Sequence, residues 1–165
     1  SISEQVRDTS LNSLGRREEM LYYPAIARDE DNHTLAMKWA PSIYQEVHDP
    51  TSGQWRHDIP TRIDFDADFT AANNLSALTT LPEESYHAAA YYHVAQTPTH
   101  HFITYIYYYP SRLSIDPMGN VPTYDEHDFT GVLLVIERAT DELLIAEGLR
   151  VEESTDVLIA FTNAD

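Results

Sequence analysis

Apolar and polar residues alternate over much of the second half of the chain, in segments separated by short polar turns. Residues 86–96 ("YHAAAYYHVAQ") and 100–110 ("HHFITYIYYYP") are rich in aromatic and β-branched residues. Between them stand Thr97, Pro98 and Thr99. Two segments of this composition joined by three turn-forming residues predict a β-hairpin.

A second hairpin is predicted nearer the C-terminus. Residues 129–138 and 142–152 flank a short turn at 139–141, and residues 155–161 ("TDVLIAF") add a last strand. The first of these segments contains a continuous apolar run, 132–136, which is typical of a strand buried on both faces.

The first half of the chain is less regular. Residues 3–20 carry a few spaced apolar residues and favour a short helix or an extended arm. Residues 38–47 are predicted to form an edge strand, because Pro41 cannot donate to a β-ladder. Residues 61–69 ("TRIDFDADF") are predicted to form a further strand.

These elements together predict an all-β fold with short turns and little helix. The architecture that we expect is an antiparallel β-sandwich with a short N-terminal helical or extended arm. The arm would comprise residues 1–37 and the sandwich domain residues 38–165.

The segment 61–69 poses a question of electrostatics. Asp64, Asp66 and Asp68 alternate with apolar residues, so a strand would place three carboxylates on one face. Water, protons or a cation must relieve the repulsion between them. Asp-x-Asp-x-Asp also begins an EF-hand loop, but the glycine and the distal glutamate of that loop are absent. The alternative is an edge strand whose carboxylates simply face water.

A second group of ionisable residues precedes the apolar run of the later hairpin. Asp125, Glu126, His127 and Asp128 are consecutive in a predicted loop. Oxygen donors outnumber the imidazole, which favours Ca²⁺ or Mg²⁺ over Zn²⁺. A loop that is merely hydrophilic is the alternative.

The first hairpin offers a candidate binding surface. A turn centred on Pro98 would place His93 opposite Ile103 and bring His93 and His101 onto one face. Tyr105 and Tyr107 follow on the same strand, and phenol rings can pack while presenting a hydroxyl to a ligand. Core packing of these side chains is the alternative.

Composition limits the classes of function. The 165 residues carry a net charge of −17, with Lys38 as the only lysine, which disfavours direct binding to nucleic acid. The high content of acidic residues is also what we expect of a protein that works in high salt.

Cysteine is absent, so thiolate chemistry is excluded. No apolar run is long enough for a transmembrane segment, and neither a Gly-x-Ser-x-Gly elbow nor a glycine-rich phosphate loop occurs.

Four ordered blocks resemble a group of microbial proteins. The blocks are "WAPSIYQEV", "TRIDFDADFTAANN", "THHFITYIYYYP" and "EHDFTGVLLVIE". Their counterparts usually read Ala-Pro-x-x-Tyr-Gln-Glu, Thr-Arg-x-Asp-Phe-Asp-Gly-Asp, Thr-His-x-Phe-Ile-x-Tyr and His-Glu-Asn-Asp-x-Glu-Gly. The resemblance covers roughly residues 39–138.

The last block is also similar to the Gly-His-Arg-His-Asp-Trp-Glu heptapeptide of necrosis-inducing (NPP1-like) proteins and to a segment of Vps62-like proteins. This resemblance implies a β-sandwich with a divalent cation held by acidic and histidine ligands. His127 and Asp128 match the His-Asp pair, whereas Thr130 stands where the family has glutamate. The row of Asp64, Asp66 and Asp68 would then supply the missing negative charge.

The function we expect is therefore that of a non-enzymatic β-sandwich module, secreted or on the cell surface. It would hold Ca²⁺ or Mg²⁺ and contact a partner protein, a glycan or a lipid headgroup. A metal-dependent hydrolase with His127 or His101 as proton carrier is one alternative. The other is a structural subunit of an extracellular or virus-like assembly, in which the N-terminal arm and the aromatic hairpin contact a further copy or a partner chain. A chain that starts at Ser1 and ends just after a predicted strand is expected to be processed or part of a longer product.

Overall fold

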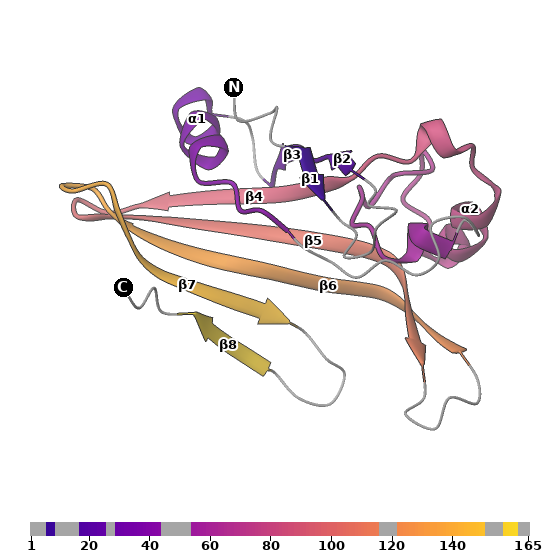
Figure 1. The fold of residues 1–165 in the computed structure, drawn as a ribbon. Coiled ribbons are helices and arrows are strands. Elements are labelled where there is room, and N and C mark those ends of the chain that lie inside the picture. The colour runs from indigo at the N-terminus through magenta and orange to yellow at the C-terminus, as the bar shows by residue number, and fades with distance from the viewer. Residues whose placement is uncertain are drawn as a thin grey trace. The chain divides into compact units, whose positions relative to one another are not determined.

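The structure is a computed structural model that describes residues 6–8, 17–25, 29–43, 54–115, 122–150 and 157–161. Its longer strands form one six-stranded sheet in the order β3-β4-β5-β6-β7-β8 (Figure 1). A separate two-stranded sheet pairs β1 with β2 in antiparallel register. The fold is thus largely β, as the sequence predicts.

The strands follow one another along the chain. Their bounds are β1 Val6–Asp8, β2 Arg17–Glu19, β3 Leu21–Pro24, β4 Ala89–Gln96, β5 His100–Ile115, β6 Pro122–Glu137, β7 Glu142–Arg150 and β8 Val157–Phe161. The helices are α1 Glu30–Lys38 and α2 Asn74–Thr80, with 3-10 turns at Gln54–His57, Ala71–Asn73 and Glu83–Ser85.

Both predicted hairpins are confirmed. In the first, the Thr97 N–H donates to the His100 carbonyl at 2.9 Å, which closes the turn between β4 and β5. In the second, the Asp141 N–H donates to the Glu137 carbonyl at 2.9 Å between β6 and β7. The β6–β7 pairing is antiparallel and shifts register between Val135 and Ile136. The last predicted strand is β8, which pairs with β7.

The described part of residues 3–20 forms strands β1 and β2, which corresponds to the extended alternative and not to the helical one. Two other predictions for the N-terminal half are wrong. Residues 38–43 end helix α1 and continue without regular structure, so they do not form the expected edge strand, and the rest of that segment lies outside the described residues. Residues 63–68 form a turn instead of a strand.

Helix α1 lies almost entirely within the predicted N-terminal arm, and local signals at both of its ends favour it. Asp29 is its N-cap, with the side chain accepting from the Asn32 N–H at 2.8 Å. Glu30 and Asp31 occupy the first turn and Lys38 the last, which complements the helix dipole at both ends.

The chain divides into two compact units, which interleave along the sequence. The first comprises residues 1–21, 41–90 and 108–128, and the second residues 22–40, 91–107 and 129–165. The buried side chains of the first unit include Trp55, Ile59, Leu78, Tyr86 and Tyr108, and those of the second include Ala36, Tyr92, Ile103, Tyr105 and Ile136.

In the second unit, helix α1 contacts one face of the β4–β5 hairpin. The Tyr105 hydroxyl donates to the Ala36 carbonyl at 2.5 Å, and the Tyr92 hydroxyl lies 3.0 Å from Nδ1 of His33. Tyr105 is fully buried, and burial raises the pKa of its phenol far above its ordinary value. This face of the hairpin is therefore core.

Candidate functional site

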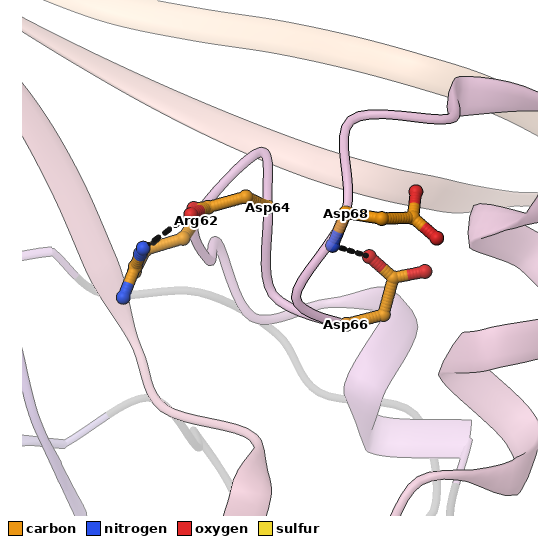
Figure 2. Close-up of polar contacts among 4 residues, drawn as sticks. All are labelled: Arg62, Asp64, Asp66 and Asp68. Carbon is orange, nitrogen blue, oxygen red and sulfur yellow. Dashed lines mark hydrogen bonds and ion pairs between the residues drawn. The ribbon is translucent and has the colours of Figure 1, made fainter.

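The three aspartates of the 61–69 segment lie in a turn and separate into distinct environments (Figure 2). The turn is fixed at its start by Thr61, whose N–H donates to the Tyr108 carbonyl and whose hydroxyl donates to the His87 carbonyl, both at 2.8 Å. The Ala67 N–H then donates to the Asp64 carbonyl at 3.0 Å. Short acidic side chains that accept from nearby backbone N–H groups favour such turns over strands.

Asp64 is neutralised within the turn. Arg62 Nε donates to one of its carboxylate oxygens at 2.8 Å, and Arg62 Nη2 donates to the other. Figure 2 shows Asp64 directed toward Arg62 and away from the other two carboxylates. The bidentate geometry satisfies both oxygens without any further cation.

Asp68 is satisfied by neutral donors. Its two oxygens accept from the Thr70 N–H at 2.5 Å and from Asn73 Nδ2 at 3.0 Å. These two hydrogen bonds, the Thr70 N–H foremost, lower the pKa of the Asp68 carboxyl. A carboxylate held in this way stays ionised at neutral pH.

Only one of the two carboxylate oxygens of Asp66 accepts a hydrogen bond from the described residues. Its Oδ1 accepts from the Asp68 N–H at 3.3 Å, whereas its Oδ2 is buried and has no hydrogen-bond partner in the described part of the chain. Figure 2 shows the Asp66 and Asp68 carboxylates on the same side of the turn.

Two asparagines that follow the turn share this property. Oδ1 of Asn73 and Oδ1 of Asn74 are buried without a hydrogen-bond partner among the described residues. Asn74 is only 3% exposed, and Asn73 binds Asp68 through its other amide atom. Segment 66–74 therefore holds three buried side-chain oxygens for which the described ranges provide no donor.

The second predicted cluster lies inside strand β6, not in a loop. His127 lies within the strand with φ 62, a left-handed conformation, and its Nδ1 lies 2.8 Å from the Tyr108 hydroxyl. The two rings are nearly parallel. The side chain of Asp125 lies outside the described residues, and Asp128 is half-buried.

Tyr108 connects the two predicted parts of the site. Its carbonyl fixes Thr61 at the start of the acidic turn, and its buried hydroxyl accepts from Asn74 Nδ2 at 2.7 Å and contacts His127. Asn74 follows directly on Asn73, which binds Asp68. Even so, no three His, Asp or Glu side chains within the described ranges gather closely enough to hold a metal.

The predicted binding surface on the first hairpin needs correction. His93 pairs with Thr104, and His101 pairs with Gln96, one residue away from the expected register. A shift of one residue exchanges the faces of a strand, so His93 and His101 lie on opposite faces. His93 is exposed, and His101 is half-buried.

The two tyrosines assigned to the same surface are core residues. Tyr105 is 0% exposed and Tyr107 5% exposed. Neither side chain is accessible to a partner in this structure.

The sequence interpretation assigned no role to Asn73 or Asn74, although two adjacent asparagines after an acidic segment were a visible signal, and it considered Tyr108 only as one of several aromatic residues of the hairpin. Phe69, which the predicted strand would have placed on its apolar face, is 81% exposed at the end of the acidic turn.

Comparison with known proteins finds no family model, no curated protein and no solved structure that matches this chain. Among the helices of the described residues, none is both long and apolar enough to cross a membrane.

Proposed function

We propose that the chain is a non-enzymatic binding module that holds a hard divalent cation, Ca²⁺ or Mg²⁺, at segment 66–74. One observation carries the proposal: Asp66 Oδ2, Asn73 Oδ1 and Asn74 Oδ1 are buried oxygens that accept no hydrogen bond from any residue that the structure describes. A buried acceptor left without a donor costs about 1–3 kcal/mol. A cation or ordered water would remove that cost at each of the three atoms.

The chemistry of these donors selects the ion. Carboxylate and amide oxygens suit Ca²⁺ and Mg²⁺, whereas Zn²⁺ prefers sulfur and imidazole. The net charge of −17 favours cations near the whole surface. Waters would complete the coordination, because Asp64 and Asp68 use their oxygens within the turn.

The backbone agrees with the resemblance to the microbial blocks. Ala67 has φ 73 and His127 has φ 62. Aligned on the quoted blocks, Ala67 stands at the glycine of Asp-Phe-Asp-Gly-Asp and His127 at the asparagine of His-Glu-Asn-Asp. Glycine and asparagine adopt left-handed conformations most readily.

The proposal also includes three features from the sequence interpretation. These are an antiparallel sandwich, a secreted or surface location, and a role of Asp125 and Asp128 near the ion.

Thermal unfolding with excess CaCl₂, MgCl₂ or EDTA tests the cation. At roughly a hundredfold excess over Kd, one bound ion adds about 2.7 kcal/mol to the free energy of unfolding. For a chain of this length, that raises Tm by about 5–10 °C.

Two isosteric variants identify the ligand. Asp66→Asn removes the charge at the unpaired oxygen and should abolish the rise in Tm. Asp64→Asn makes the same chemical change at the carboxylate bound by Arg62 and should retain the rise. Equal Tm in EDTA and in both salts for the unmodified chain contradicts the proposal, and equal behaviour of the two variants contradicts the assignment to Asp66.

A further inference from the structure

The acidic turn exposes its apolar side chains and partly buries its charged ones. Phe69 is 81% exposed and Ile63 37% exposed, and Ala67 between them is exposed as well. The three aspartates of the same turn are half-buried. This arrangement reverses that of an ordinary protein surface, on which carboxylates face water. Apolar side chains that are exposed together on one short segment indicate contact with an apolar partner.

Phe69 is the residue of the turn best placed for such a contact. It is the most exposed large apolar side chain of the described residues, and the next is Ile145 at 41%. Asp68 Oδ1 accepts from the Thr70 N–H at 2.5 Å, which closes the chain across Phe69, and Asp68 Oδ2 accepts from Asn73 Nδ2 at 3.0 Å. Because these bonds already fix the backbone on both sides of the ring, little conformational entropy is lost when the ring binds.

The same turn carries the proposed cation, and the inference rests on that proposal. Asp66 Oδ1 accepts from the Asp68 N–H at 3.3 Å, so Asp66 belongs to the hydrogen-bonded turn that presents Phe69. Phe69 is three positions after Asp66, which limits the distance between their Cα atoms to about 11 Å. A partner of modest size can therefore contact both the Phe69 ring and an ion at Asp66.

The open coordination positions of the ion indicate the polar part of that partner. Segment 66–74 offers three unpaired oxygens, whereas Ca²⁺ binds about 6–8 oxygen ligands. Oxygens of a phosphate or carboxylate group can replace water at the remaining positions. Segment 66–74 contains no Lys, Arg or His, so the cation is the group of this segment that would attract an anion.

A bilayer with anionic lipids combines an anionic headgroup with an apolar phase. Side chains at membrane interfaces are buried about 5–10 Å into the boundary between headgroups and acyl chains, which agrees with the limit on the distance between Phe69 and Asp66. Fluid acyl chains accept a protruding ring without a shaped pocket. A second copy of the chain is less suited, because each copy carries a net charge of −17 and repels the other over its whole surface.

We infer that the turn at residues 63–69 is a membrane contact, in which the cation bridges Asp66 to an anionic lipid headgroup while the Phe69 ring enters the bilayer.

Sedimentation of the full chain with lipid vesicles tests this contact. The vesicles contain equal parts of phosphatidylcholine and phosphatidylserine, in CaCl₂, MgCl₂ or EDTA, and vesicles of phosphatidylcholine alone are the neutral probe. We expect binding to the anionic vesicles with at least one of the two cations. In EDTA we expect none, since the net charge of −17 then repels the anionic surface. Equal binding in EDTA, or equal binding to the neutral vesicles, overturns the inference.

Three variants test the contribution of Phe69. Phe69→Ser alters an exposed side chain and should fold, but it should bind the anionic vesicles at least about tenfold more weakly, because no ring leaves water. Phe69→Trp should retain binding, since tryptophan favours the membrane interface. Leu144→Ser removes a side chain that is 39% exposed on strand β7, in the other unit, and should bind as the unmodified chain does. Unchanged binding in Phe69→Ser, or an equal loss in Leu144→Ser, overturns the assignment to Phe69.

Two further measurements separate the possible failures. Phe69→Ser should keep the rise in Tm with the cation, because Phe69 supplies no ligand. A rise in Tm without vesicle binding in the unmodified chain overturns the membrane contact alone, whereas no rise in Tm contradicts the cation proposal and the membrane contact with it. Light scattering without vesicles covers the second copy: a dimer that forms with the cation and is lost in Phe69→Ser overturns the membrane contact.

Discussion

Replacing Ala67 by glycine should stabilise the protein, against the usual effect of that substitution. Ala67 has φ 73 directly after the turn closed by its N–H to the Asp64 carbonyl. A left-handed conformation costs a residue with a Cβ about 1–2 kcal/mol. Glycine removes this strain but gives the unfolded chain more freedom, which offsets about 0.4–1 kcal/mol. The net gain is therefore about 0.5–1 kcal/mol.

The same substitution in helix α2 provides a matched control. Ala77 is an interior residue of α2, and its carbonyl accepts from the Leu81 N–H at 2.9 Å. Glycine at this position should destabilise the protein by about 1 kcal/mol. Urea unfolding of both variants, followed by circular dichroism, compares the midpoints at a common slope. If Ala67→Gly unfolds at or below the urea concentration of the unmodified chain, the left-handed backbone at residue 67 is refuted.

Three further outcomes follow from burial, contact and charge. Gly131→Ala should cost about 1–3 kcal/mol in urea unfolding, because the added Cβ would lie 2.6 Å from the Tyr105 carbonyl oxygen; an unchanged midpoint contradicts the close approach. Phe69→Ser should shift stability by less than about 0.5 kcal/mol, since Phe69 is 81% exposed, and a large loss would place its ring in the core. Burial, followed by the nearby Arg138 guanidinium, lowers the pKa of His101, so the unfolded chain binds that proton more readily. Stability should therefore fall as the pH drops below about 6.5, and His101→Gln should unfold with a weaker pH dependence over that range.

The sequence predicted the hairpins well because their signals are local. Aromatic and β-branched residues on both sides of residues 97–99 suffice to specify the β4–β5 pairing. The exact register of the β4–β5 pairing cannot be predicted from the composition of the two strands alone. The pairing of His101 with Gln96 instead of Ala95 depends on how the turn closes, and this difference of one residue places His93 and His101 on opposite faces of the hairpin instead of on one face.

The acidic segment failed as a predicted strand because alternation alone does not distinguish a strand from a turn stabilised by side chains. Phe65, Ala67 and Phe69 alternate with aspartates as a half-buried strand would. The deciding contacts are those of Asp66 and Asp68 with backbone N–H groups two residues further along the chain. Aspartate forms such contacts in competition with the β-ladder.

The repulsion among three adjacent carboxylates is thus relieved mainly by local partners. Arg62 neutralises Asp64, and the Thr70 N–H with the Asn73 amide satisfies Asp68. Counting acidic residues overstates the need for a cation, because a carboxylate whose oxygens already accept hydrogen bonds has little left to offer an ion. What attracts a cation is the number of buried lone pairs without donors. By that measure, among the described residues, Asp66 is joined by two neutral asparagines rather than by its acidic neighbours, so the charge pattern of the sequence alone does not point to these amide oxygens.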